Sequence, residues 1–244
     1  MRTLSVGLRP LSPERWLEQA DPGELAAKVA ILDAHPEAVA WLPGSEPAQA
    51  ELAGVLAAWP ATMAGCGRAV VDDLCLLDAD TLALVAGAVA APNRWRLADK
   101  LGAPPSAVHR GVPGYAGRLA DHVDRVLRAL APGRAVERRS WAVLDDPTLH
   151  QPGPTAAVPE AADPDRLWLR VERQALRRLP VTGAVAFAIR TRQWRLDELV
   201  AHPDQAAGLA AALRSTPDDL AGYKGVDAVR PRLLAWLDGG GGNR

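Results

Sequence analysis

The stretch RLWLRVERQAL, residues 166–176, decides the fold of this 244-residue chain. Its side chains alternate with the period of two that is typical of a β-strand, because successive residues of a strand point to opposite faces of its sheet. One face carries Leu167, Leu169, Val171, Arg173 and Ala175, and the other carries Trp168, Arg170, Glu172, Gln174 and Leu176. Arg173 interrupts the apolar row. It therefore binds a carboxylate or an anionic ligand, or this end of the strand leaves the core and Arg173 meets solvent.

Four further segments are predicted as strands. AVERRSWAVL (135–144) precedes the central stretch, and TGAVAFAIRT (182–191) follows it after a tight link. Upstream, two apolar segments over 69–91 are separated by Asp78–Asp80, which predicts a hairpin, although the alanine-rich second half is also compatible with a helix. Asp72 and Asp73 in the first half are typical of an edge or turn-facing pair rather than a catalytic dyad.

The other segments have helical or irregular patterns. Within residues 92–133, an amphipathic stripe runs from Leu119 to Leu130 and stops at Pro132. Residues 1–68 contain short helical patterns punctuated by prolines, and amphipathic helices are predicted beyond residue 195. The connection 145–165 is too poor in large apolar residues to hold core structure.

Two strands, a helical segment and three strands follow one another in the order of a PAS domain. We therefore predict an α+β fold: a PAS-like five-stranded antiparallel sheet with a helical insert between strands two and three, a helical N-terminal leader and C-terminal helices. The predicted domains are a leader or cap over 1–68, a PAS-like core over 69–195, C-terminal helices over 196–238 that pack on the core, and a disordered tail over 239–244. A PAS domain holds its ligand in the concavity under the insert.

Composition narrows the class of protein. Hydrophobic residues make up 48% of the chain, which is normal for a globular protein, and the formal net charge of −1 removes the usual electrostatic argument for nucleic-acid binding. Two cysteines cannot form a disulfide framework or a four-thiolate metal site. The chain shows neither a signal-peptide pattern nor an apolar run of about 18 residues. We expect a reduced, cytoplasmic protein without nucleic-acid or membrane partners.

The motifs of common enzymes are missing: there is no GxxxxGK[ST], HExxH or GxSxG, and no GxGxxG after a strand. Without evident means of binding NAD(P) or an iron–sulfur cluster, any redox reaction would take its electrons from another protein. His109 is distinctive because a proline pair and a glycine-rich turn flank it in PPSAVHRGVPGY. It is either a heme or metal ligand or a satisfied structural histidine. The remaining histidines, His35, His122, His150 and His202, are expected at the surface or, for His122, at a cap of the insert.

A set of segments in order along residues 7–225 resembles the family of heme-dependent oxidative N-demethylases. The segments are GLRPLSPERWL, VVDDLCLL, PNRWRLADKLG, VHRGVPGY, ERRSW, LRVERQALRRLP, TGAVAFAIRT and AGYKG. LRVERQALRRLP together with RWRLADKLG is specific, whereas either alone is a weak signal.

The resemblance implies that the core over 69–195 is a heme-binding PAS domain that acts as an oxygenase. Such an enzyme uses O₂ and electrons from a separate flavin/iron–sulfur reductase to oxidise a small amine, and it releases the dealkylated amine and formaldehyde. The resemblance makes His109 the proximal ligand of the iron of heme b, with the opposite side open to O₂.

The resemblance also implies roles for residues around the heme. Glu172 and Arg173 are candidates for polarising O₂ and for holding a cationic amine, but alternation lets only one of them face the pocket unless a bulge intervenes. The other candidates are Arg94, Arg96 and Arg139, which are propionate partners or surface ion-pairing residues, and Tyr115 and Trp141, which are pocket walls or packing groups.

Two other functions stay open. One is a heme-based gas or redox sensor without turnover, and the other is a heme-free protein that binds a small organic cation or serves as a partner subunit. The chain also departs from the family: Asp72 stands where a longer acid is expected, and 145–165 carries no family motif. The substrate is therefore a small amine, a larger amine or another nitrogen compound.

Overall fold

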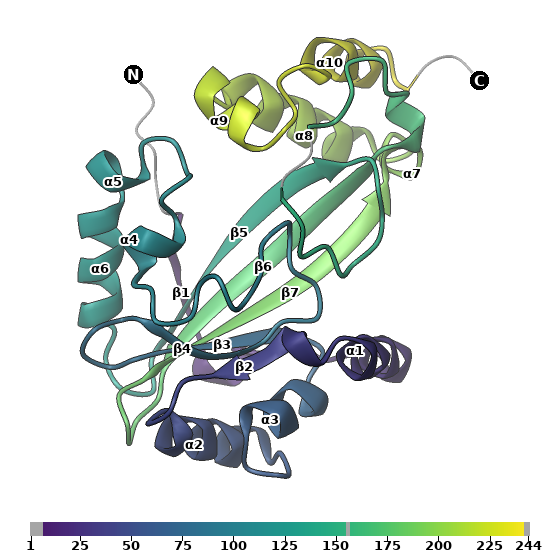
Figure 1. Cartoon of the computed structure of the whole chain (residues 1–244). Coiled ribbons are helices and arrows are strands. Elements are labelled where there is room, and N and C mark those ends of the chain that lie inside the picture. Colours follow the sequence, from purple (N-terminus) through teal and green to yellow (C-terminus); the bar gives the residue numbers. More distant parts are fainter. Residues whose placement is uncertain (1–6, 155–156, 242–244) are drawn as a thin grey trace.

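A single antiparallel sheet organises the computed structural model, which describes residues 7–154 and 157–241. Within these ranges the sheet has seven strands in the order β1-β5-β6-β7-β3-β4-β2 (Figure 1). The strands are β1 (Arg9–Leu11), β2 (Val39–Trp41), β3 (Asp73–Leu77), β4 (Leu84–Ala88), β5 (Ala135–Leu144), β6 (Trp168–Arg178) and β7 (Val185–Arg195). The three longest, β5 to β7, are adjacent.

All five predicted strand segments are strands, and they occupy adjacent positions in the sheet. The prediction of a five-stranded sheet was nevertheless wrong, because the leader adds a strand to each edge: β1 pairs with β5, and β2 pairs with β4. The helices expected in the leader are present, and the leader also contributes these two strands. Each added strand has three residues, too few to show an alternating pattern in the sequence.

The helices fall into three groups along the chain. The leader contains α1 (Pro22–Ala34), α2 (Glu46–Leu56) and α3 (Met63–Ala69), with short 3-10 turns at Pro13–Arg15 and Pro36–Ala38. The insert contains α4 (Pro105–Val108), α5 (Tyr115–Arg118) and α6 (Ala120–Ala129). A 3-10 turn at Pro164–Arg166 precedes β6, and the C-terminal group contains α7 (Leu196–Leu199), α8 (Pro203–Ser215), α9 (Asp218–Tyr223) and α10 (Arg230–Asp238).

The leader and the insert cover opposite faces of the sheet. On one face, Leu74 and Leu76 of β3 pack in a cluster with Leu52 and Met63 of the leader. On the other face, Cys75 and Leu84 pack against Leu97, and Leu176 packs with Leu127 of α6. Because the side chains of a strand alternate between the two faces, these contacts show which residues of β5, β6 and β7 point toward the insert and which point toward the leader.

The C-terminal helices gather at the far end of the long strands (Figure 1). Val143 and Leu169, on the leader-side row of the sheet, join a cluster with Leu213 and Leu233 of α8 and α10. Val158 is buried in the same cluster. The connection 145–165, expected to be too poor in large apolar residues to hold core structure, thus places one valine in the core.

The chain end begins as a hydrogen-bonded continuation of α10. The amides of Gly239, Gly240 and Gly241 donate to carbonyls of the last helical turn, so the first part of the predicted disordered tail is ordered. Residues 242–244 lie outside the described residues. None of the helices in the described ranges has the length and apolar character needed to cross a membrane.

Candidate functional site

His109 lies at the C-terminal end of α4, a short helix that begins with proline at a position where the ring fits. Its Nδ1 lies 2.8 Å from the carbonyl oxygen of Pro105. A carbonyl only accepts, so Nδ1 carries the proton and donates, and a neutral ring then leaves a lone pair on Nε2. Burial lowers the pKa of His109 against the opposing effect of the Pro105 carbonyl, and the cations of Arg138 and Lys100 lower it further. The imidazole is therefore held neutral, in the tautomer that can bind a metal through Nε2.

Tyr115 fixes the other side of this ring. The rings of His109 and Tyr115 stack with their centroids 4.6 Å apart and their planes 13° from parallel. Burial raises the pKa of Tyr115 to about 12, and its Oη is a buried atom without a hydrogen-bond partner among the described residues. The insert thus presents an oriented histidine with Tyr115 packed on one face of its ring.

Facing the insert, β5, β6 and β7 present polar side chains where a covered sheet face is usually apolar. These residues, here called the polar floor, are Arg138, Ser140, Arg170, Glu172, Gln174 and Thr191. At its centre the carboxylate of Glu172 accepts from Arg170 Nε at 3.1 Å and from Gln174 Nε2 at 2.9 Å. Both donors come from the same strand, two residues on either side, so the sheet itself holds the carboxylate in place.

Arg138 connects the polar floor to the insert. Its guanidinium lowers the pKa of His109 and opposes the rise at Tyr115. Burial lowers the pKa of Arg138 itself, and the nearby carboxylate of Glu172 and the Tyr115 phenol oppose that change. The histidine, the tyrosine and the glutamate therefore share one electrostatic environment, with Arg138 between them.

The end of α9 supplies a second cation to this environment. Burial lowers the pKa of Lys224 to about 8, an effect that Glu172 opposes and Arg138 reinforces. Lys224 Nζ donates to the carbonyl of Trp141 and lies 4.5 Å from the centre of its ring. A Cβ placed on Gly111 would lie 3.7 Å from the Tyr223 ring, so the end of α9 also approaches the insert.

Buried polar atoms around this region lack partners within the described ranges. They are Tyr115 Oη, Asp124 Oδ1, Arg138 Nε, Arg170 Nη1 and Gln193 Nε2. Leaving such an atom unpaired costs about 1–3 kcal/mol, so clusters of them mark places where another group supplies the missing bonds. The donor set fits a cofactor with anionic groups and a metal that accepts a neutral imidazole.

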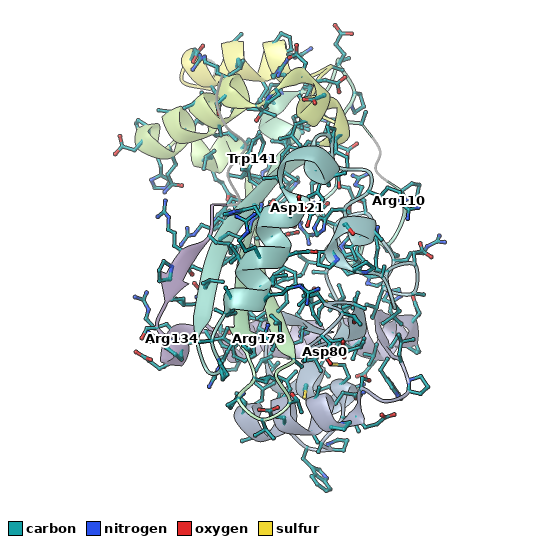
Figure 2. All side chains as sticks on the ribbon, turned by 90° about the vertical axis from the view of Figure 1, so that its left-hand side faces the viewer. Asp80, Arg110, Asp121, Arg134, Trp141 and Arg178 are labelled. Atoms are coloured by element: carbon teal, nitrogen blue, oxygen red, sulfur yellow. The ribbon has the colours of Figure 1, made fainter. Side chains whose placement is uncertain are left out.

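Helix α6 fastens the insert to the sheet beneath the site. Figure 2 shows the helix with Asp121 at the end nearer Trp141, and with Asp80 and Arg178 near its other end. Arg128 Nη1 donates to the carbonyl of Asp80, and Arg178 Nη2 donates to the carbonyl of Leu127. These bonds anchor α6, and the chain that carries His109 leads through α5 into it.

The structure places Arg173 away from His109 and Glu172, on the leader face of β6. Its Nε lies 2.6 Å from Glu137 Oε2 and 3.4 Å from Glu18 Oε1, and the guanidinium also donates to the carbonyls of Trp16 and Arg15. Of the alternatives considered for Arg173, the structure shows the one with carboxylate partners in the core. The strand carries no bulge at this position, so Glu172 alone of the pair faces the insert.

The other predicted contacts are also distributed differently. Arg94 pairs with Asp145 at 3.3 Å, beside the connection after β5. Arg96 and Arg139 are exposed, and Arg139 stands opposite Arg173 on the leader face. Trp141 lies on the same leader-facing row as Arg139, packs on the C-terminal cluster and contacts Lys224 of the site. The structure thus stacks Tyr115 on His109 and places Arg138 near both Tyr115 and Glu172. Arg139 lies on the opposite face of the sheet, whereas Arg94 keeps a buried Nε without a partner among the described residues.

The sequence reasoning missed Arg138, Tyr223 and Lys224. Signals for them existed: Arg138 lies in ERRSW, in the same alternating row as Ser140, and the other two lie in AGYKG. Both segments belong to the resemblance described above. The phase of the strand, which decides between Arg138 and Arg139, becomes visible only from the pairing of β5 with β6.

Fold and site together define an α+β protein whose insert carries an oriented histidine and whose sheet presents polar side chains to the insert. A family model described as haem-dependent oxidative N-demethylase, alpha subunit-like, matches residues 58–234, which is most of the chain. The chain belongs to this family, as the sequence motifs predicted. The family name denotes a heme-dependent oxidative enzyme. His109, the polar floor and Lys224 all lie within the matched residues.

Proposed function

We propose that the protein is a heme-dependent oxygenase that removes a small alkyl group from an amine by oxidation. The observation that carries this proposal is the orientation of His109: Nδ1 donates to the Pro105 carbonyl, so the lone pair of the neutral ring is on Nε2, and the residue is exposed at the surface of the insert, where Nε2 is accessible to a ligand. The family match supports the heme and the oxidative chemistry. The central five strands with the insert would form the PAS-like heme-binding core.

The residues of the site fit heme b. His109 would bind the iron through Nε2, in the neutral tautomer that the Pro105 carbonyl selects. Arg138 and Lys224 both lie near Glu172, whose carboxylate already pairs with Arg170. Their positive charges would suit the heme propionates. Heme, when bound, supplies a redox-active iron at which O₂ is reduced.

Glu172 would hold the substrate. An amine carries a positive charge when protonated, and a carboxylate that two neighbouring donors orient is a preorganised partner for it. The overall reaction consumes one N-methyl amine, one O₂, two electrons and two protons, and yields the demethylated amine, formaldehyde and water. The electrons would come from a separate flavin/iron–sulfur reductase, in the cytoplasm.

The first test is the visible spectrum of the protein purified with ample heme, before and after dithionite and carbon monoxide. A Soret band that shifts with carbon monoxide is expected for a heme at which O₂ can react. His109→Ala should lose the heme or change its spectrum, whereas His122→Ala, an exposed position on α6, should not. An unchanged spectrum in His109→Ala would remove the central claim. A featureless spectrum of the wild type would exclude both the oxygenase and the heme-based sensor, and a heme-free binding protein would be the remaining interpretation.

The second test separates an oxygenase from a sensor. The heme-loaded protein is supplied with O₂ and with electrons from a surrogate flavin reductase, and formaldehyde is measured over a panel of N-methyl amines. Amine-dependent formaldehyde that requires both O₂ and reductase supports turnover. Carbon monoxide binding without any formaldehyde across the panel would favour the sensor.

A further inference from the structure

A second cluster of possible metal ligands lies outside the heme site. It consists of His35 and Glu37, which flank the start of a 3-10 turn in the leader, and His150 of the connection after β5. Their candidate ligand atoms all lie within 4.8 Å of one another. His35 Nδ1 lies 3.2 Å from Glu37 Oε1, and His150 Nε2 lies 3.8 Å from the same oxygen.

His150 is the residue that points to a cation. Its Nδ1 lies 3.0 Å from the carbonyl oxygen of Ala90, so Nδ1 donates and a neutral ring has its lone pair on Nε2. The side chain is only 8% exposed, and Nε2 is buried without a hydrogen-bond partner in the described chain. Two acceptor atoms, Nε2 and Glu37 Oε1, therefore face each other.

Acceptors that face each other need a cation between them. A proton on Nε2 would have to bridge 3.8 Å, which exceeds the length of a hydrogen bond. A metal ion bridges such a gap naturally, because its bonds to imidazole nitrogen and carboxylate oxygen are each about 2.0–2.2 Å long. We propose that His35, Glu37 and His150 bind one divalent zinc ion, with water as the fourth ligand.

The residue types and their surroundings support this choice. Two imidazoles and one carboxylate form a donor set that zinc accepts in tetrahedral geometry. The Ala90 carbonyl orients His150 as an outer partner orients a metal ligand. The His35 and Glu37 side chains are 40% and 64% exposed, so they have the freedom to close on a fixed His150.

Binding requires one visible rearrangement. The rings of His35 and His150 stack, with centroids 3.8 Å apart and planes at 19°. A metal lies in the plane of each imidazole that binds it, so His35 must turn out of the stack. The bound form therefore differs from the free form at His35 and leaves His150 in place.

The site would fasten the connection after β5 to the leader. The same stretch is already held where the amide of Arg94 donates to the carbonyl of Gln151. Leu149, next to His150, lines a cavity of about 160 Å³ together with Lys28 and Asp73. Zinc bound to His150 would hold the neighbouring Leu149 in place in the wall of this cavity. It would also stabilise the folded chain, because the unfolded chain does not hold these ligands together.

The test uses the full chain, stripped with a chelator and titrated with zinc chloride. We expect one equivalent bound by calorimetry and elemental analysis, with a rise in Tm. His150→Ala and Glu37→Gln should each weaken binding at least about tenfold, while His202→Ala, exposed at the start of α8, should bind like the wild type. Glu37 is exposed, so its variant tests the site without a folding defect.

Two results would overturn the proposal: no zinc bound by the stripped wild type, or equal binding by the wild type and Glu37→Gln. The His109→Ala variant should bind zinc like the wild type, because His109 is not part of the proposed zinc site. This result would show that the bound zinc is not held by the candidate heme ligand. Nuclear magnetic resonance of the histidine rings adds an independent readout. Zinc should shift the His35 and His150 signals and leave the His202 signal in place.

Discussion

Glu172 and Arg173 are consecutive residues of β6 whose side chains lie on opposite faces of the sheet and have no partner in common. Glu172 accepts from Arg170 and Gln174 on the insert face, whereas Arg173 is buried against Glu137 on the leader face. One strand thus contributes a carboxylate to the candidate site and an ion pair to the core. Substitutions at the two positions should affect different properties of the protein.

Arg173→Ala should destabilise the fold. The substitution leaves the partly buried Glu137 without its cation and two leader carbonyls without their donor, whereas Glu18 keeps Arg192. The loss should be about 1–3 kcal/mol. Urea unfolding measures the loss. Arg139→Ala is the matched control, because Arg139 stands opposite Arg173 in β5 and is exposed; its effect should stay within about 0.5 kcal/mol. Equal losses for the two variants would contradict this account.

Glu172→Gln should impair amine oxidation, and its free energy of unfolding is measured alongside because Glu172 also faces the buried cation of Arg170. Glutamine keeps the shape and removes the negative charge that would attract a protonated amine, so KM should rise at least about tenfold, as expected when about 1.4 kcal/mol of binding is lost. Formaldehyde release at varied amine concentration gives KM and kcat. Glu198→Gln, an exposed acid on α7, should behave like the wild type. An unchanged KM in Glu172→Gln would remove Glu172 from substrate binding.

Much of the sheet was predictable because its strands alternate over many residues. The pattern of residues 166–176 gave a strand and placed Glu172 and Arg173 on different faces, as the structure confirms. The two edge strands were not predictable, because three residues carry no period and the partner strand is distant in sequence. The partners of Arg173 are distant in the same way: Glu18 and the Trp16 carbonyl come from the leader.

The site was predictable only in part. His109 and Tyr115 lie in one short segment with strong turn signals, and the structure stacks them. The arginine of the site was not fixed, because ERRS places polar residues on both faces of β5 and a shift of one residue exchanges Arg138 for Arg139. Only the pairing of Arg138 with Gln174 settles the phase.

Tyr115→Phe should not weaken the heme-free protein. The Oη atom is buried without a partner in the described chain, so its removal should leave the free energy of unfolding unchanged or raise it by up to about 1 kcal/mol. Tyr115→Ala removes the ring that packs on His109 and should cost about 3–5 kcal/mol. Urea unfolding of both variants decides the matter. A loss above about 1 kcal/mol in Tyr115→Phe would mean that Oη has a partner in solution.

Gly67→Ala should show how closely the leader packs on the sheet. A Cβ at Gly67 of α3 would lie 2.6 Å from the Cβ of Ala88 in β4, so the helix must shift, at a cost of about 1–3 kcal/mol. Gly54→Ala in α2 is the control, because nothing lies within 4 Å of its added Cβ. That helix should gain about 0.5–1 kcal/mol from the better helix former. Thermal unfolding measures both changes, and equal Tm shifts would refute the close contact.

Asp72 should make stability depend on pH in a direction opposite to that of most acids. Burial raises the pKa of Asp72 to about 6, against the opposing effects of Arg190 and Lys28. The folded state therefore binds a proton that the unfolded chain has already released between about pH 4 and pH 6. The contribution of this group to stability is full below about pH 4 and is lost as the pH rises through about 6.

Asp72→Asn removes this titration and keeps the size of the side chain. Lys28 and Arg190 retain Asp73 and Glu24 as counter-charges, so the variant should fold. Two pKa units correspond to about 3 kcal/mol; relative to the wild type, the variant should therefore gain up to that amount between pH 4 and pH 7. Urea unfolding at both pH values gives the difference directly. A difference that is the same at pH 4 and pH 7 would show that Asp72 has an ordinary pKa and that Arg190 neutralises the cost of its burial.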